Sequence, residues 1–109
     1  MSKTQPAGLK DLESFEKVFK ALSHKARRHI LVVLNARGGH MSSSEIAHRF
    51  SCSWPTTTRH LRVLEHAGLV SIHSKGRERM YSLNRQTMLS SLDHWTQWFR
   101  KDNDKSTKE

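Results

Sequence analysis

Cysteine is almost absent from this sequence, and so are long apolar runs. Cys52 is the only cysteine among 109 residues, which excludes an intrachain disulfide and a four-cysteine zinc site. The longest apolar run, residues 30–34, is far too short to span a membrane, and residues 1–8 lack the apolar core of a signal peptide. We therefore expect a protein of the reducing cytoplasm with no membrane partner.

Acidic residues are also scarce. The chain has 10 Asp and Glu against 19 Lys and Arg, which gives a formal net charge of +9. Such an excess favours a polyanionic partner, either nucleic acid or an anionic membrane, although a basic domain without such a partner has the same composition. No paired carboxylates, nucleophile motif or phosphate-binding glycine loop can be placed, so we expect neither an enzyme nor a cofactor.

The length suits one small domain, which we place at residues 9–100. Residues 1–8 and 101–109 are mostly polar, charged or small, and they cannot bury enough apolar surface to offset the entropy cost of ordering. We expect a disordered N-terminal arm and a disordered, charged C-terminal tail.

Apolar residues spaced by three and four predict helices over the first half of the domain. The first helix ends near Leu22, and Ser23 is suited to cap the second, which the glycine pair 38–39 terminates. A short third helix follows, with Ser43 or Ser44 as its N-cap.

The fourth predicted helix has the clearest boundaries. Ser53 suits its N-cap, Pro55 is tolerated in its first turn, and Gly68 suits a left-handed C-cap. Its buried face consists of residues spaced by four and three, which are Thr57, Leu61 and Leu64. The opposite face is therefore free for a partner.

Strand periodicity surrounds a basic turn at residues 75–77. Val70 and Ile72 alternate with polar residues before the turn, and Tyr81 and Leu83 do so after it. A last amphipathic helix follows. The predicted fold is mainly α with a small β-hairpin, in the order helix, helix, helix, helix, hairpin, helix, which is a winged helix-turn-helix.

The outward face of the fourth helix has the chemistry of a DNA-reading helix. Arg59 suits a bidentate contact to guanine, threonine methyl groups suit the thymine methyl, and Arg62 suits the phosphate backbone. The residues that we expect at DNA on this face are Trp54, Pro55, Thr56, Thr58, Arg59, His60 and Arg62. The alternative is a surface helix with ordinary solvated charges, which the neighbouring basic hairpin makes less favoured.

Basic residues also surround the glycine at the tip of the hairpin. Arg77 suits the minor groove and Lys75 a phosphate, with Arg79 beside them. We expect this wing, residues 73–79, to lie on the minor groove or the backbone. The alternative is a charged hairpin that keeps the protein soluble and discourages strand pairing.

Three segments resemble the ArsR-type winged helix-turn-helix repressors, in a likeness that covers roughly residues 15–99. They are residues 19–31 (FKALSHKARRHIL), 53–70 (SWPTTTRHLRVLEHAGLV) and 75–84 (KGRERMYSLN). The tryptophan-bearing last helix looks most like the short, autoregulatory branch of the family. The resemblance implies a homodimer formed by the first and last helices, an inverted-repeat operator in double-stranded DNA, and repression of transcription. It also adds Ser53 to the residues expected at DNA.

Aromatic residues gather on the last helix, where they suit an interface. We expect the first and last helices to form the dimer interface through Phe15, Val18, Phe19, Leu92, Trp95, Trp98 and Phe99. The alternative for the aromatic residues of the last helix is a platform on which single-stranded bases stack.

The metal-binding motifs of many family members are absent. Ser-Ser-Glu at residues 43–45 stands where those members have a cysteine pair, and Asp93 and His94 are adjacent with no second histidine after them. We therefore expect no metal, although a site between subunits that uses His94 or His40 stays open.

Two residues keep two interpretations each. Cys52 is either a small, partly buried residue, which we favour because no resolving cysteine is present, or a thiol whose oxidation acts close to DNA. Trp54 either packs on the core or meets DNA.

Two competing functions also stay open, an RNA-binding winged-helix module and a histidine-dependent metalloenzyme. Competition between RNA and duplex DNA would test the first, and elemental analysis for bound metal would test the second.

Overall fold

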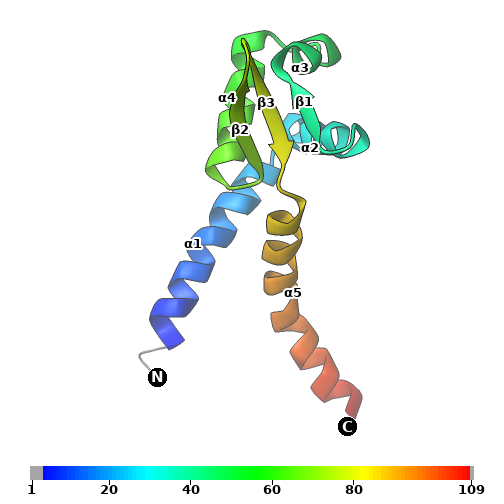
Figure 1. The fold of residues 1–109 in the computed structure, drawn as a ribbon. Helices are drawn as coiled ribbons and strands as arrows, with labels where there is room; N and C mark the ends of the chain where they lie inside the picture. Colours follow the sequence, from blue (N-terminus) through cyan, green and yellow to red (C-terminus); the bar gives the residue numbers. More distant parts are fainter. Residues whose placement is uncertain (1–3, 109) are drawn as a thin grey trace.

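The computed structural model describes residues 4–108, and the side chains of residues 12–100. Within this part of the chain there are five helices and a small antiparallel sheet, and α2, α3 and α4 lie beside the sheet (Figure 1). The elements are α1 (Thr4–Leu22), α2 (Lys25–Ala36), β1 (His40–Ser42), α3 (Ser43–Arg49), α4 (Trp54–His66), β2 (Val70–Lys75), β3 (Glu78–Leu83) and α5 (Arg85–Lys108). The predicted winged helix-turn-helix, mainly α with one hairpin, is confirmed.

The sheet has one strand more than the hairpin that we predicted. Its order is β1-β3-β2, and β1 pairs with β3 through Met41 opposite Tyr81 and His40 opposite Ser82. Both central residues of this pair are buried, with 1% of Met41 and of Tyr81 exposed. A strand of three residues is too short for its alternation to be distinguished from a loop, which is why the sequence pattern missed it.

Two of the predicted helix caps are wrong by one residue. His24, not Ser23, caps α2, because the hydroxyl of Ser23 instead donates to Lys20 O at the end of α1. Ser42, not Ser43 or Ser44, caps α3, and it forms a reciprocal pair with Glu45. In this pair the Ser42 amide donates to the Glu45 carboxylate at 2.8 Å, which satisfies the helix end from both sides.

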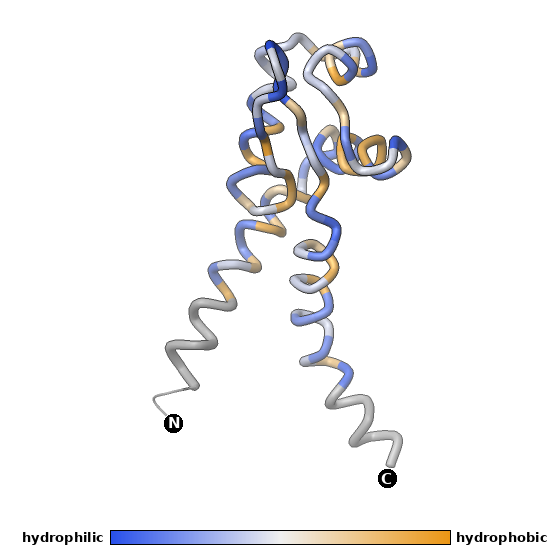
Figure 2. Tube along the Cα trace, viewed as in Figure 1, coloured by the Kyte–Doolittle hydropathy of each residue, from blue (hydrophilic) through white to orange (hydrophobic). Residues whose placement is uncertain are grey.

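The core is formed where α2, α3, α4 and the sheet meet. Figure 2 shows apolar residues on the inner sides of these elements and hydrophilic residues at the tip of the hairpin. The largest fully buried side chains are Tyr81, Leu34, Met41, Ile46, Leu61, Leu64, Leu69 and Val70. This core packs against the buried face of α4 and against the base of the hairpin.

The helices α1 and α5 extend away from this body on the same side (Figure 1). Aromatic contacts join them near the body, where the ring of Trp95 lies 5.8 Å from that of Phe15 and 5.6 Å from that of Phe19. α1 begins at Thr4 and α5 ends at Lys108, so both helices enter the segments for which we predicted disorder. The side chains there lie outside the described residues, and the disorder of 1–8 and 101–109 stays a prediction. Within the described part of the chain, no helix is both long and apolar enough to cross a membrane.

Candidate nucleic-acid interface

The helix α4 is fixed to the core along one face and free along the other. Ser53 caps it, as predicted, because its hydroxyl accepts a hydrogen bond from the Thr56 amide at 3.3 Å. Thr57, Leu61 and Leu64 are buried, with at most 2% of each exposed. The chain then turns at Gly68, whose φ of 81° is the left-handed conformation that the sequence predicted.

The free face presents two arginines. Arg59 and Arg62 are exposed, and neither makes a hydrogen bond or an ion pair within the described part of the chain. Together with Lys17 and Lys20 of α1, they line an open groove of about 490 Å³ along the side of α4. Unpaired guanidinium groups in such a position are available to bases and phosphates.

The first turn of α4 is less free than the sequence suggested. Ser53 and Thr56 hydrogen bond to each other as part of the cap. The hydroxyl oxygen of Thr58 is buried, because this side chain faces the hairpin rather than the solvent. It has no hydrogen-bond partner within the described residues. Trp54 is 37% exposed and lines a cleft of about 320 Å³ with Thr58, Arg77 and Arg79. Trp54 therefore lies at the cleft between α4 and the wing, outside the buried core, and its contact with DNA stays a prediction.

His60 belongs to a cluster that joins three helices. Arg27 of α2 lies with its Nη1 atom 3.3 Å from His60 Nδ1, and the ring of His24 lies 4.5 Å from that of His60. Burial lowers the pKa of His60, and the nearby His24, Arg27 and Arg59 lower it further. Spacing along the sequence did not reveal this pair of histidines, because they are 36 residues apart, one at the N-cap of α2 and the other within α4.

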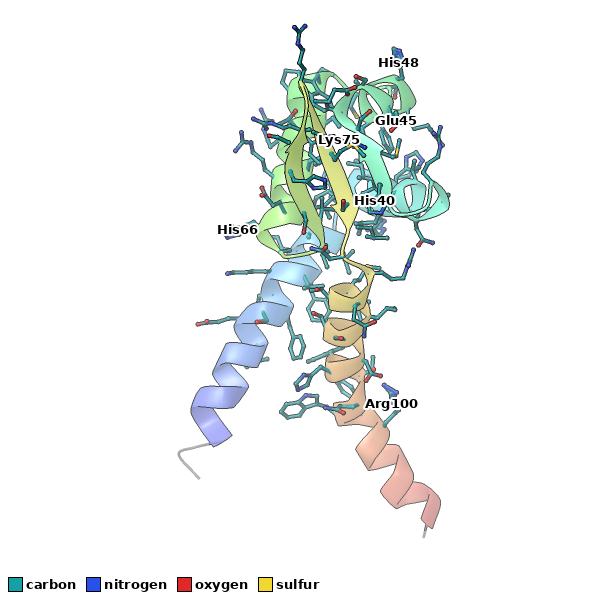
Figure 3. All side chains as sticks on the ribbon, in the orientation of Figure 1. His40, Glu45, His48, His66, Lys75 and Arg100 are labelled. Carbon is teal, nitrogen blue, oxygen red and sulfur yellow. The ribbon has the colours of Figure 1, made fainter. Side chains whose placement is uncertain are left out.

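The wing is a tight hairpin with an exposed basic tip. Lys75 pairs with Glu78 across a two-residue turn, and Gly76 in that turn has a φ of 64°. Lys75, Arg77 and Arg79 are all exposed, as a surface for DNA requires. Figure 3 shows Lys75 on the hairpin, far from Arg100 on α5.

One acidic side chain anchors this basic hairpin. The carboxylate of Glu78 accepts hydrogen bonds from the amide and hydroxyl of Ser44, and the hydroxyl of Ser43 lies 3.5 Å from the same oxygen. The hydrogen bonds from Ser44 lower the pKa of Glu78. No local pattern in the sequence predicts this contact, because it joins the wing to a helix residue 34 positions earlier.

The predicted dimer surface is only partly accessible. Phe15 and Val18 lie in the core of their own chain, 4% and 2% exposed, because α5 and the body cover them. Trp98 and Phe99 are 55% and 53% exposed, and Leu89, nearer the start of α5, is exposed as well. Phe19, Leu92 and Trp95 are half-buried. Trp98 and Phe99 on α5 therefore offer exposed apolar surface that a second chain would cover, and the interface itself stays a prediction.

Histidines and the single cysteine do not gather into a metal-binding cluster within the described residues. Figure 3 shows His40, His48 and His66 on different elements, well apart from one another. The pair that does meet, His24 and His60, has both Nδ1 atoms engaged, with the Ala26 amide and with Arg27. Cys52 is exposed rather than partly buried. Its position does not test whether the thiol is reactive.

Two helices joined by a short turn, α3 and α4, with a basic hairpin beside the second, define a winged helix-turn-helix protein. Comparison with known proteins agrees with this class. A family model described as a helix-turn-helix domain matches residues 22–73. The transcriptional repressor SdpR of Bacillus subtilis (strain 168) is 40% identical over 88 residues, which are 80% of this chain and 96% of SdpR.

Solved structures extend the comparison to the fold. An ArsR-like transcriptional regulator from Rhodococcus sp. RHA1 has a TM-score of 0.74 at 26% identity, and the match covers 89% of each chain. An ArsR family transcriptional regulator of known structure also has a TM-score of 0.74, at 25% identity, over 84% of this chain and 92% of the other. The chain belongs to the ArsR-type family of winged helix-turn-helix transcriptional repressors. Members of this family are DNA-binding regulators of transcription, not enzymes.

Proposed function

We propose that this protein represses transcription by binding an inverted-repeat operator with α4 in the major groove. The observation that supports this most strongly is the two-sided α4. Its buried face fixes the helix to the core, while Arg59 and Arg62 on the other face have no partner within the described residues. Arg59 reads guanine and Arg62 contacts the backbone.

The wing supplies a second contact beside the helix. Lys75 and Arg77 lie on the exposed tip, where the hairpin reaches the backbone or the adjacent minor groove. Arg79 and Trp54 line the cleft between wing and helix, so this cleft faces the sugar-phosphate strand that crosses from one groove to the next. Phosphate contacts of this kind make the affinity fall steeply as the salt concentration rises.

A homodimer places two copies of α4 on one face of the duplex. Trp98 and Phe99 supply the exposed apolar surface on α5 that such a dimer buries. Recognition helices of a two-fold dimer meet half-sites about 34 Å apart, which is one turn of DNA. Because the dimer is two-fold symmetric, the two half-sites form an inverted repeat. Repression then follows in the cytoplasm, because the bound dimer excludes the polymerase from the promoter. Autoregulation, as in the short branch of the family, predicts such a repeat upstream of the protein's own gene.

Competition between nucleic acids tests this proposal against RNA binding. The protein is first bound to a labelled duplex that contains the selected operator, and unlabelled competitors are then added. The proposal predicts that operator duplex displaces the label at much lower concentration than random duplex or structured RNA does, by 10³-fold or more, on the order of typical operator specificity. Displacement by structured RNA at the same concentration as operator DNA would overturn it.

A further inference from the structure

Arg27 occupies a position from which it contacts two other helices at once. Its guanidinium donates from Nε to Ala21 O at 2.8 Å and from Nη2 to Lys20 O at 3.0 Å, both at the C-terminal end of α1. Its third nitrogen, Nη1, lies 3.3 Å from Nδ1 of His60 on α4. Arg27 and His60 are both half-buried, so these contacts are sheltered from water on one side.

The chemistry of this contact fixes the proton on His60. A guanidinium has only donors, so Nδ1 of His60 must be the acceptor and cannot hold a proton. The proton of the neutral imidazole is therefore on Nε2, and the lowered pKa of His60 keeps the ring neutral near pH 7. A neutral ring in this form offers one donor and no acceptor to a partner outside the cluster.

We infer that Arg27 is a positioning residue, which holds the His60 imidazole as an Nε2–H donor and ties its orientation to the end of α1. A donor accepts no hydrogen bond from the amino group of cytosine, whereas guanine, adenine and thymine all present an acceptor in the major groove. The His60 contact therefore discriminates against cytosine at one base position. This base preference rests on the proposed DNA-reading role of α4, but the state of the His60 ring does not.

The neighbouring Arg28 provides a matched control. Its guanidinium donates to Leu22 O at 2.7 Å, so it also contacts a carbonyl at the end of α1, and no contact with His60 is recorded for it. Arg27→Met and Arg28→Met each remove one charge and the backbone contacts while keeping an unbranched side chain. Both variants lose contacts with the end of α1, two in Arg27→Met and one in Arg28→Met, whereas a change at His60 is expected only in Arg27→Met.

The first measurement is ¹⁵N NMR of the histidine rings of the wild-type protein without DNA. We expect an unprotonated Nδ1 and a protonated Nε2 for His60, and the opposite assignment would overturn the inference without any variant. In Arg27→Met we expect the His60 pKa to rise and the ring to sample both tautomers, while Arg28→Met leaves both unchanged. An unchanged His60 titration in a folded Arg27→Met variant would equally overturn it.

The second measurement concerns the DNA sequence that each protein selects. We expect Arg27→Met to lose about tenfold in discrimination against cytosine at one position of each half-site, and Arg28→Met to keep it. A uniform loss of affinity in both variants would mean that Arg27 only stabilises the fold. If no variant and no wild-type protein binds DNA, the proposed function fails, but the NMR result on His60 still stands or falls independently.

Discussion

Glu78 at the start of β3 accepts hydrogen bonds from both the amide and the hydroxyl of Ser44 on α3, at 3.2 and 2.6 Å. This contact joins the tip of the wing to α3, the helix that precedes α4. It also places a carboxylate among the arginines of the hairpin. A negative charge at this position repels DNA phosphates, so we expect it to have a structural role that compensates for this cost. We interpret Glu78 as the residue that fixes the angle between the wing and the helix-turn-helix.

Glu78→Gln is expected to loosen the wing without unfolding the protein. The amide keeps the size of the side chain but loses the charge that strengthens the hydrogen bonds from Ser44. We expect faster hydrogen exchange in β2 and β3 and weaker operator binding, although the variant is less acidic. A variant that binds operator DNA more tightly than wild type, with unchanged exchange, would show that Glu78 is only an unfavourable charge.

The same variant makes a prediction about pH. The pKa of Glu78 is lowered in the folded protein, mainly by the hydrogen bonds from Ser44, so its contribution to stability is present above the pKa of the unfolded chain. That contribution disappears as the pH falls through the lowered value. In thermal unfolding, wild type and Glu78→Gln should therefore differ near neutral pH and converge in acid. A difference that stays constant from neutral to acid pH would contradict this assignment.

Lys75→Ala is expected to weaken binding to all DNA sequences by a similar factor. Lys75 is exposed on the wing, where we propose that it neutralises a phosphate and reads no base. Loss of one phosphate contact should reduce the slope of log affinity against log salt by about 0.9. Lys25→Ala, which removes an exposed lysine at the start of α2, is the control for net charge. An equal change in slope for both variants would place the wing away from DNA.

Trp98→Ser is expected to weaken the dimer at least about tenfold, since aromatic residues dominate the binding energy of interfaces. Trp98 is 55% exposed on α5, so the substitution removes no core packing within the chain. Val32→Ser, at a 64% exposed position on α2, is the control for loss of exposed apolar surface. Sedimentation equilibrium measures the effect, and a wild-type protein that is monomeric at micromolar concentration while it binds its operator would contradict the predicted dimer.

Leu61→Ala is expected to destabilise the fold by about 2–5 kcal/mol, the range for buried leucines. No part of Leu61 is exposed, and it holds α4 against the core. Val32→Ala should change the free energy of unfolding by less than about 0.5 kcal/mol, because that side chain is largely in solvent. Urea unfolding of both variants provides the measurement, and similar values for the two would contradict the assigned position of α4.

Local patterns predicted the parts of the fold that depend on neighbouring residues. Thr57, Leu61 and Leu64 repeat at helical spacing, and the structure buries all three. Ser53 and Gly68 have the local chemistry of a cap and a stop, and both occupy those positions. The class of the fold followed from these elements in order.

Contacts between distant parts of the chain had no signature in the sequence. Nothing in a local pattern brings Glu78 to Ser44, or His24 to His60, because chain topology alone decides these contacts. The same limitation explains Phe15 and Val18, which the helical pattern assigned correctly to an apolar face, but which α5 and the body cover within one chain. It also explains Thr58, whose hydroxyl faces the hairpin that packs beside α4.

We propose above all that α4 reads a specific DNA sequence through Arg59. Selection of bound sequences from random DNA, carried out in parallel with wild type, Arg59→Ala and the control Lys25→Ala, tests it most directly. We predict that wild type and Lys25→Ala select the same inverted repeat, with half-sites about one helical turn apart, and that Arg59→Ala loses the preference for guanine at one position of each half-site. Selection of the same sequence by Arg59→Ala, or of no consensus by wild type, would contradict the account.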